Sequence, residues 1–196
     1  MDKRFVIKKS EITEAELDDI SQIHYDNISG NLTKLGKSFI KKIYLDLLSS
    51  NKNFVTILKN KTEIIGFVIF SLDTKKSKYL FIKKIFFFLI WFSLLSIFSL
   101  KIINLIRLIF EARTVETSEA EVELYTITVK EKYSNQGFGK ELILESEKYL
   151  KSLNILSYIV RTDHKNILTN KFYKKAGFEF FMKRNNSNFY KKKYNK

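Results

Sequence analysis

The sequence contains no cysteine and no proline, and only two of its 196 residues are histidines. The absence of cysteine excludes disulfide bonds, a thiol nucleophile and any metal site built on thiolates. His24 and His164 lie far apart in the sequence, so a zinc or di-iron site would have to consist mostly of carboxylates, which such sites rarely do. We therefore predict chemistry without a bound metal.

The chain also lacks the features that mark domain boundaries or export. It has no internal repeat and no Gly/Ser-rich linker, and its length suffices for one domain with a core. We predict a single domain over residues 1–196. The first residues, MDKRFVIKKSEITEAELDD, contain no apolar stretch of the kind found in signal peptides. This predicts a cytoplasmic location, and a place at the inner face of the membrane stays open.

Acidic residues are outnumbered: 35 lysines and arginines face 21 aspartates and glutamates, for a net charge of +14. Such an excess is typical of proteins with anionic partners. However, lysine, asparagine, isoleucine and phenylalanine are abundant along the whole chain, so we attribute the excess of positive charge mainly to a general compositional bias. The positive charges are scattered, and residues 1–30 hold more acids than bases. We therefore expect no nucleic-acid partner.

Hydrophobic periodicity predicts an α/β (α+β) chain with a mixed sheet flanked by helices. A capping box, formed by Thr13 and Glu16, marks the start of the first helix. Strands are predicted at 4–8, 53–58, 63–72, 121–129, 156–161, 178–183 and 188–194, and helices at 13–28, 33–48, 137–153 and 166–175.

A glycine turn stands between the strand at 121–129 and the helix that follows it. Gly137 and Gly139 have no Cβ, so the backbone can turn tightly and approach a ligand. The free N–H groups at the start of the helix favour an anion, and Lys140 adds a positive charge. A glycine pair that only eases a strand-to-helix corner is the alternative. A nucleotide P-loop and a Rossmann fingerprint are both excluded, because Glu141 follows Lys140 and Leu142 stands three residues after Gly139.

Two blocks of the chain resemble the GCN5-related N-acetyltransferase (GNAT) superfamily. Residues 134–139 read Ser-Asn-Gln-Gly-Phe-Gly and match the acyl-CoA motif [Arg/Gln]-x-x-Gly-x-[Gly/Ala], except that Ser134 stands at the first position, where Gln136 and Lys140 could compensate. Residues 166–178 match the family's second block at Asn166, Phe172, Tyr173, Lys175, Gly177 and Phe178, with Thr169 at its alanine position. The resemblance covers about residues 121–180.

The resemblance implies a GNAT-like fold, with a central, mostly antiparallel mixed sheet, and an acyl-CoA co-substrate. It implies that pantetheine lies along the strand before the turn and that a backbone N–H there polarises the thioester carbonyl. The implied cofactor-binding residues are Ile127, Thr128, Val129, Ser134, Asn135, Gln136, Gly137, Phe138, Gly139, Lys140, Asn166 and Tyr173.

Four side chains have a functional and a structural interpretation. Tyr173 is implied as the general acid for the CoA thiolate, or it is an aromatic core anchor. Glu123 is our candidate for the base that deprotonates the amine, or it is an ordinary strand glutamate. Asn166 holds pantetheine or caps a helix. His24, on a helix that borders the acceptor cleft in this family, binds substrate or lies at the core edge.

A strongly hydrophobic insertion occupies residues 76–114, between the third and fourth strands. Residues 85–100 are almost entirely apolar, but a single membrane crossing there would put the two parts of one sheet on opposite sides. Three interpretations stay open: a helical hairpin that packs on the domain or in a homodimer, a segment at residues 85–110 that contacts the membrane peripherally, or the lining of a lipid pocket.

Taken together, these features predict an acyl-CoA-dependent N-acyltransferase. We predict an acetyltransferase with acetyl-CoA as co-substrate, and a longer acyl-CoA stays open. The acceptor is predicted to be a primary amine, on an amino sugar, a glycolipid-type compound or another membrane-associated molecule. A membrane-associated, non-catalytic CoA-binding or scaffold protein on the same fold is the alternative, which Ser134 favours.

Overall fold

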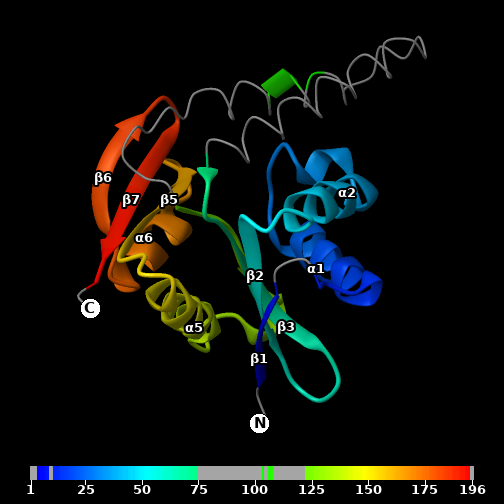
Figure 1. Ribbon diagram of the computed structural model, residues 1–196. Helices are drawn as coiled ribbons and strands as arrows, with labels where there is room; N and C mark the ends of the chain where they lie inside the picture. The colour runs from blue at the N-terminus through cyan, green and yellow to red at the C-terminus, as the bar shows by residue number, and fades with distance from the viewer. Residues whose placement is uncertain (1–3, 9–10, 75–102, 104–105, 108–121, 195–196) are drawn as a thin grey trace.

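The computed structural model describes residues 4–8, 11–74, 103, 106–107 and 122–194 (Figure 1). Within these ranges the strands are β1 (Arg4–Lys8), β2 (Asn53–Lys59), β3 (Ile64–Ser71), β4 (Glu123–Val129), β5 (Ser157–Asp163), β6 (Glu179–Arg184) and β7 (Ser187–Lys193). The helices are α1 (Glu14–Asn27), α2 (Lys37–Leu48), α5 (Phe138–Ser152) and α6 (Ile167–Lys175), with 3₁₀ turns η1 (Thr33–Leu35) and η2 (Glu131–Tyr133).

The predicted hydrophobic insertion at residues 76–114 lies outside the described residues, except for three positions. Ile103 and Ile106 are both exposed there. In the part of the chain that the structure describes, no helix is long and apolar enough to cross a membrane. The three interpretations of the insertion therefore stay predictions.

The strands form one mixed sheet in the order β1-β2-β3-β4-β5-β7-β6. All neighbours are antiparallel except β4 and β5, which are parallel. This confirms the predicted mixed, mostly antiparallel sheet. The sequence indicated two closing strands but not their order, and β7 inserts between β5 and β6.

Helices cover both faces of the sheet (Figure 1). On one face, α1 and α2 bury Ile20, Ile40 and Tyr44 against strand residues such as Phe67. On the other face, α5 and α6 pack over a larger apolar core whose members include the buried residues Phe54, Phe70, Leu142, Tyr158 and Tyr173. Two apolar layers on either side of one sheet are what hold the strand ends in place.

The first helix begins as the sequence predicts. The side chain of Thr13 accepts a hydrogen bond from the Glu16 backbone N–H at 3.2 Å, and the Thr13 N–H donates to the Glu16 carboxylate at 3.1 Å. The second predicted helix differs: instead of one helix over 33–48, the chain forms η1, which ends at Leu35, and α2, which begins at Lys37, with Gly36 between them. Gly36 has a φ of 93°, a conformation that no α-helix continues through.

The two parallel strands β4 and β5 separate soon after they begin. They pair only at Glu123 with Ile159 and at Leu124 with Val160. On the β3 side, Thr126 pairs with Ile69 and Leu124 with Phe70, so Tyr125 is the extra residue of a β-bulge. A bulge bends its strand and increases the local twist. The remainder of β4, from Thr126 to Val129, thus borders an opening in the sheet on the side away from β3.

Candidate functional site

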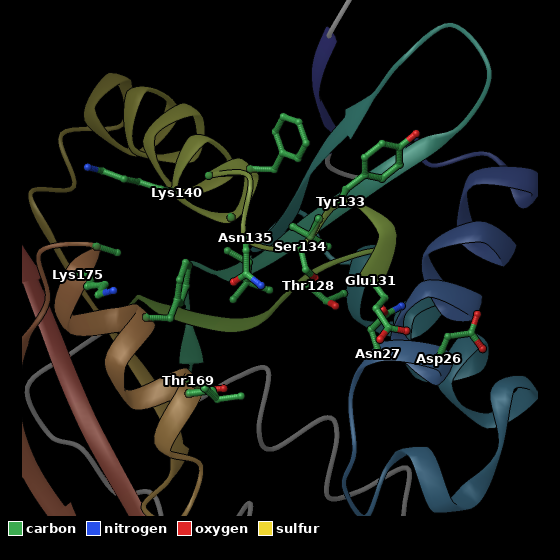
Figure 2. Close-up of a pocket in the computed structure, with 18 residues that line it drawn as sticks. Asp26, Asn27, Thr128, Glu131, Tyr133, Ser134, Asn135, Lys140, Thr169 and Lys175 are labelled. Atoms are coloured by element: carbon green, nitrogen blue, oxygen red, sulfur yellow. The ribbon is translucent and has the colours of Figure 1, made fainter. Parts of the chain in front are cut away.

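A cleft with a volume of about 690 Å³ lies beside the end of β4 (Figure 2). That volume is within the range typical of sites for small molecules and cofactors. Its walls are the end of β4, the loop after it, the first turn of α5, one face of α6 and the last residues of α1. The lining residues are Asp26, Asn27, Ile127, Thr128, Val129, Glu131, Tyr133, Ser134, Asn135, Gly137, Phe138, Gly139, Lys140, Leu168, Thr169, Phe172, Lys175 and Ala176.

The glycine turn forms one wall of this cleft. Gly137 is the N-cap of α5 and adopts a left-handed conformation with φ of 86°, which favours glycine. No side chain caps this helix end. Gly139 lies against α6, where an added Cβ would be 3.1 Å from two ring atoms of Phe172. The turn therefore combines uncapped helix N–H groups with a close contact between α5 and α6, an arrangement that suits an anion.

The cleft is electrostatically divided. Lys140 and Lys175 lie on one side, near the start of α5 and the end of α6 (Figure 2). Asp26 and Asn27 of α1 and Glu131 of the loop line the opposite side (Figure 2). This distribution of charge suits a ligand with phosphate groups beside the lysines and a second, cationic molecule beside the carboxylates.

Comparison with known proteins identifies the family. The model of the "Acetyltransferase (GNAT) family" matches residues 100–178, a range that includes the glycine turn and the Asn166–Phe178 block. This part of the chain matches the GNAT family. The match confirms the predicted resemblance and the enzyme class, an acyl-CoA-dependent acetyltransferase with acetyl-CoA as co-substrate.

Solved structures of other GNAT proteins share this fold at low identity. A GNAT-family acetyltransferase from Listeria monocytogenes is 13% identical with a TM-score of 0.62, over 97% of this chain and 95% of that one. PaiA N-acetyltransferase from Thermoplasma acidophilum, solved with coenzyme A, is 16% identical with a TM-score of 0.61, over 99% and 100%. A protein from Desulfovibrio desulfuricans is 11% identical with a TM-score of 0.62, over 97% and 99%. No curated protein sequence matches the chain closely enough to count as a relative.

Most of the predicted cofactor-binding residues of this GNAT domain line the cleft. The structure brings together the end of β4 (Ile127, Thr128, Val129) and most of the turn (Ser134, Asn135, Gly137, Phe138, Gly139, Lys140). Gln136 is not among the lining residues, because its side chain turns back and donates a hydrogen bond to the Lys132 carbonyl at 3.2 Å. Ser134, the departure from the family motif, does line the cleft.

Three predicted residues besides Gln136 and His24 lie outside the cleft lining. Asn166 is the N-cap of α6, where its side-chain oxygen accepts a hydrogen bond from the Thr169 N–H at 3.0 Å. Glu123 is buried at the closed end of the opening between β4 and β5, and Tyr173 is buried next to the lining residue Phe172. For Asn166 this is the capping position; the functional roles of Glu123 and Tyr173 stay predictions.

His24 is buried between α1 and α2. Its Nδ1 lies 2.5 Å from the hydroxyl oxygen of Tyr44, and the two rings meet edge to face with centroids 5.6 Å apart. Burial lowers the pKa of His24 to about 4, so the ring is neutral near pH 7. Asp26 and Asn27, at the end of the same helix, line the cleft while His24 does not. Its predicted contact with substrate stays a prediction.

The buried histidine predicts a specific dependence of stability on pH. Between about pH 6.5 and 4 the unfolded chain binds a proton at His24 that the folded protein does not, so the free energy of unfolding falls as pH drops through this range. His24→Gln lacks this term. We expect the wild type to be more stable than the variant at pH 7 and the difference to shrink toward pH 4. Thermal unfolding of both proteins at several pH values checks this, and a difference independent of pH would contradict it.

Sequence reasoning missed several cleft residues. Thr169 and Phe172 on one face of α6, and Ala176 at its C-cap, line the cleft, and their helical spacing was a usable signal. Asp26, Asn27 and Glu131 carried no such signal, because their proximity depends on how α1 packs beside β4.

Proposed function

We propose that this chain transfers an acetyl group from acetyl-CoA to a primary amine that enters the cleft from its acidic side. One observation supports this above all. The cleft runs from an uncapped glycine turn with nearby lysines, past an open strand edge, to a pair of carboxylates. Each part suits one part of the reaction: phosphates, the acyl-pantetheine arm and a cationic amine.

The CoA half follows from the backbone. The N–H groups at the start of α5 and the ammonium of Lys140 would bind the pyrophosphate. Backbone groups of a strand alternate between its two sides, so half of those after the bulge point away from β3, toward the cleft. These groups would pair with the pantetheine amides, and one N–H would hold the oxyanion that develops on the thioester carbonyl.

Two side chains would move protons. Burial raises the pKa of Tyr173 above its ordinary value, so its hydroxyl carries the proton that the leaving thiolate would need. The proposed donor role rests on this protonation state and on the position of Tyr173 next to the lining residue Phe172. An ammonium group cannot attack a carbonyl, so the amine must first lose a proton. Glu123 is the proposed acceptor of that proton, and its buried position at the closed end of the opening favours transfer through water.

The acceptor would be recognised by charge. Asp26 and Glu131 present carboxylates, and Asn27 presents an amide between the same walls. In a chain with a net charge of +14, such a local acidic surface attracts a cationic amine that the rest of the molecule repels. An amino sugar, a glycolipid-type amine and other membrane-associated amines all carry the required group.

Calorimetric titration followed by a turnover assay tests the proposal. Acetyl-CoA is expected to bind at one saturable site. In the turnover assay, a diamine, an amino sugar and ethanolamine are tested as acceptors, and transfer to any of them is detected as the free thiol of the released CoA. Asp26→Asn combined with Glu131→Gln should raise KM for the amine roughly tenfold, about 1.4 kcal/mol, with unchanged acetyl-CoA affinity. Asp46→Asn and Glu145→Gln, on other surfaces, make the matched control. Absence of acetyl-CoA binding would contradict the proposal, while binding without any turnover would support the non-catalytic alternative.

A further inference from the structure

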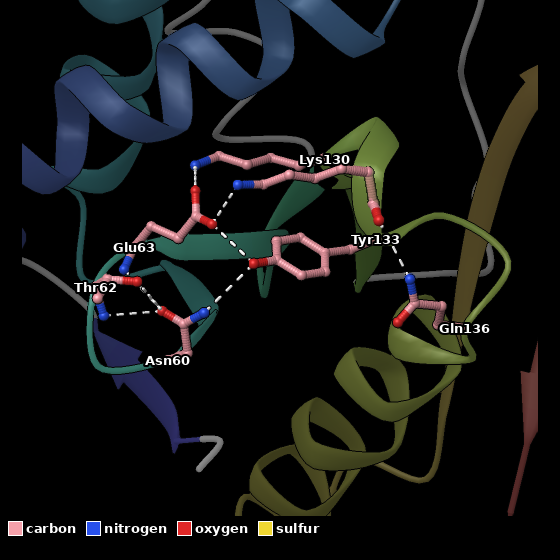
Figure 3. A network of polar contacts seen from close by, with 7 residues as sticks. Asn60, Thr62, Glu63, Lys130, Tyr133 and Gln136 are labelled. Carbon is pink, nitrogen blue, oxygen red and sulfur yellow. Dashed lines mark hydrogen bonds and ion pairs between the residues drawn. The ribbon is translucent and has the colours of Figure 1, made fainter. Parts of the chain in front are cut away.

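A polar network beside the cleft joins the β2–β3 turn to the loop between β4 and α5 (Figure 3). The carboxylate of Glu63 is its centre. Glu63 Oε2 lies 2.6 Å from Lys130 Nζ, and Oε1 lies 2.5 Å from Lys132 Nζ. The Tyr133 hydroxyl donates to the same Oε1 at 2.8 Å. One side chain therefore holds three residues of a loop that lies 67 to 70 positions further along the chain.

The turn that carries Glu63 is itself well braced. The side-chain oxygen of Asn60 accepts hydrogen bonds from the backbone N–H groups of Thr62 at 2.9 Å and Glu63 at 2.8 Å. The Asn60 N–H donates to the Glu63 carbonyl at 3.0 Å, and the Asn60 amide reaches the Tyr133 hydroxyl at 3.5 Å. Glu63 thus meets the loop from a turn with little freedom to move.

The loop is held from its outer side and lines the cleft with its inner side. Glu131, Tyr133 and Ser134 line the cleft, whereas Lys130 and Lys132 do not. Tyr133 connects the two sides: its hydroxyl contacts Glu63, while its ring packs edge to face on Phe138, the first residue of α5, with centroids 6.1 Å apart. The position of Glu63 is thereby transmitted to the glycine turn.

We propose that Glu63 is a positioning residue for acyl-CoA: it fixes the loop so that the glycine turn is ready for the pyrophosphate. The inference rests on the proposed function and adds a residue to it that touches no substrate. The Lys130 ammonium, with Lys132 and the Tyr133 hydroxyl, lowers the pKa of Glu63 to about 2, so the carboxylate stays charged in neutral solution. A preorganised loop binds more tightly because less ordering is left for the ligand to impose.

Charge and position predict opposite results for one substitution. Glu63→Gln removes a negative charge near a site for phosphates and frees two lysines, so charge alone predicts tighter binding of acetyl-CoA. Loss of positioning predicts weaker binding. We expect Kd and KM for acetyl-CoA to rise about tenfold in Glu63→Gln, with kcat within about twofold of wild type.

Two companion variants keep the test specific. Glu145→Gln makes the same change of charge on the exposed side of α5, where Glu145 pairs only with Lys148 among the described ion pairs, and it should leave Kd nearly unchanged. Asn60→Ala changes no charge but loosens the turn, so it should weaken binding in the same direction as Glu63→Gln.

Hydrogen exchange of the ligand-free protein supplies an independent readout. Amides in residues 130–139 should exchange faster in Glu63→Gln and Asn60→Ala than in wild type, while those of α1 should not. Equal or tighter acetyl-CoA binding by Glu63→Gln, or unchanged exchange in the loop, would overturn the positioning role. If the wild type binds no acetyl-CoA, the proposed function fails and this inference with it; unchanged exchange with intact wild-type binding removes the inference alone.

Discussion

Gly137→Glu is expected to weaken acetyl-CoA binding at least about 100-fold, a loss of roughly 2.7 kcal/mol. The substitution puts a carboxylate at the uncapped N-terminus of α5, where the pyrophosphate would lie. It also forces a side chain onto a backbone with φ of 86°, which costs about 1–2 kcal/mol for an ordinary L-residue. Isothermal titration of acetyl-CoA into both proteins measures the loss.

Two controls separate the carboxylate from the strain and from the added charge as such. Gly137→Gln imposes nearly the same backbone strain as Gly137→Glu but adds no charge, so the affinity that it regains measures the effect of the carboxylate. Gly30→Glu adds the same charge in an open loop position, with nothing within 4 Å of an added Cβ, and should bind normally. Wild-type affinity in Gly137→Glu would show that the turn is only a structural corner.

Tyr173→Phe is expected to lower kcat by about 10²–10⁴-fold and leave acetyl-CoA affinity unchanged. The variant removes one hydroxyl and retains the ring, which packs on Phe178 and Tyr190 with centroids 5.3 and 6.1 Å away. The fold should therefore persist. Single-turnover measurements of acetyl transfer, alongside binding and thermal unfolding, distinguish the chemical step from binding and from folding.

Tyr190→Phe is the matched control from the same aromatic cluster. The Tyr190 hydroxyl donates to the Asn170 side chain at 2.7 Å, so its loss should cost stability of about 0.5–1.5 kcal/mol without affecting kcat. The two variants thus have opposite expected profiles: activity is lost in one and stability in the other. If Tyr173→Phe turns over at the wild-type rate, Tyr173 is a core anchor, and the thiolate takes its proton from another group.

The parts of the site that the sequence predicted are those encoded locally. The glycine turn and the Asn166–Phe178 block are short segments whose residue types and spacing are informative by themselves. The capping box at Thr13 and Glu16 was visible for the same reason. Gly36 also carried a usable signal, since a glycine inside an apolar helical pattern can mark the end of a helix.

The remaining features depend on contacts between distant segments. Glu63 meets Lys130, Lys132 and Tyr133 only because β3 pairs with β4, and no local pattern marks this carboxylate. The acidic side of the cleft likewise depends on the packing of α1. The side chain of Asn166 caps α6, one of the two roles that the sequence allowed, and its contact with the cofactor stays a prediction.

The short pairing between β4 and β5 forms a junction, here called the seam, between two parts of the sheet. Strands β1 to β4 and strands β5 to β7 are two blocks that share two residue pairs and the bond from the Ile159 N–H to the Val122 carbonyl. A ligand that hydrogen-bonds along β4 and also contacts α6 would bridge both blocks. Its hydrogen bonds would replace those that β4 and β5 do not make with each other. Binding at this seam would raise the cooperativity of the whole fold, because neither block could then separate without first releasing the ligand.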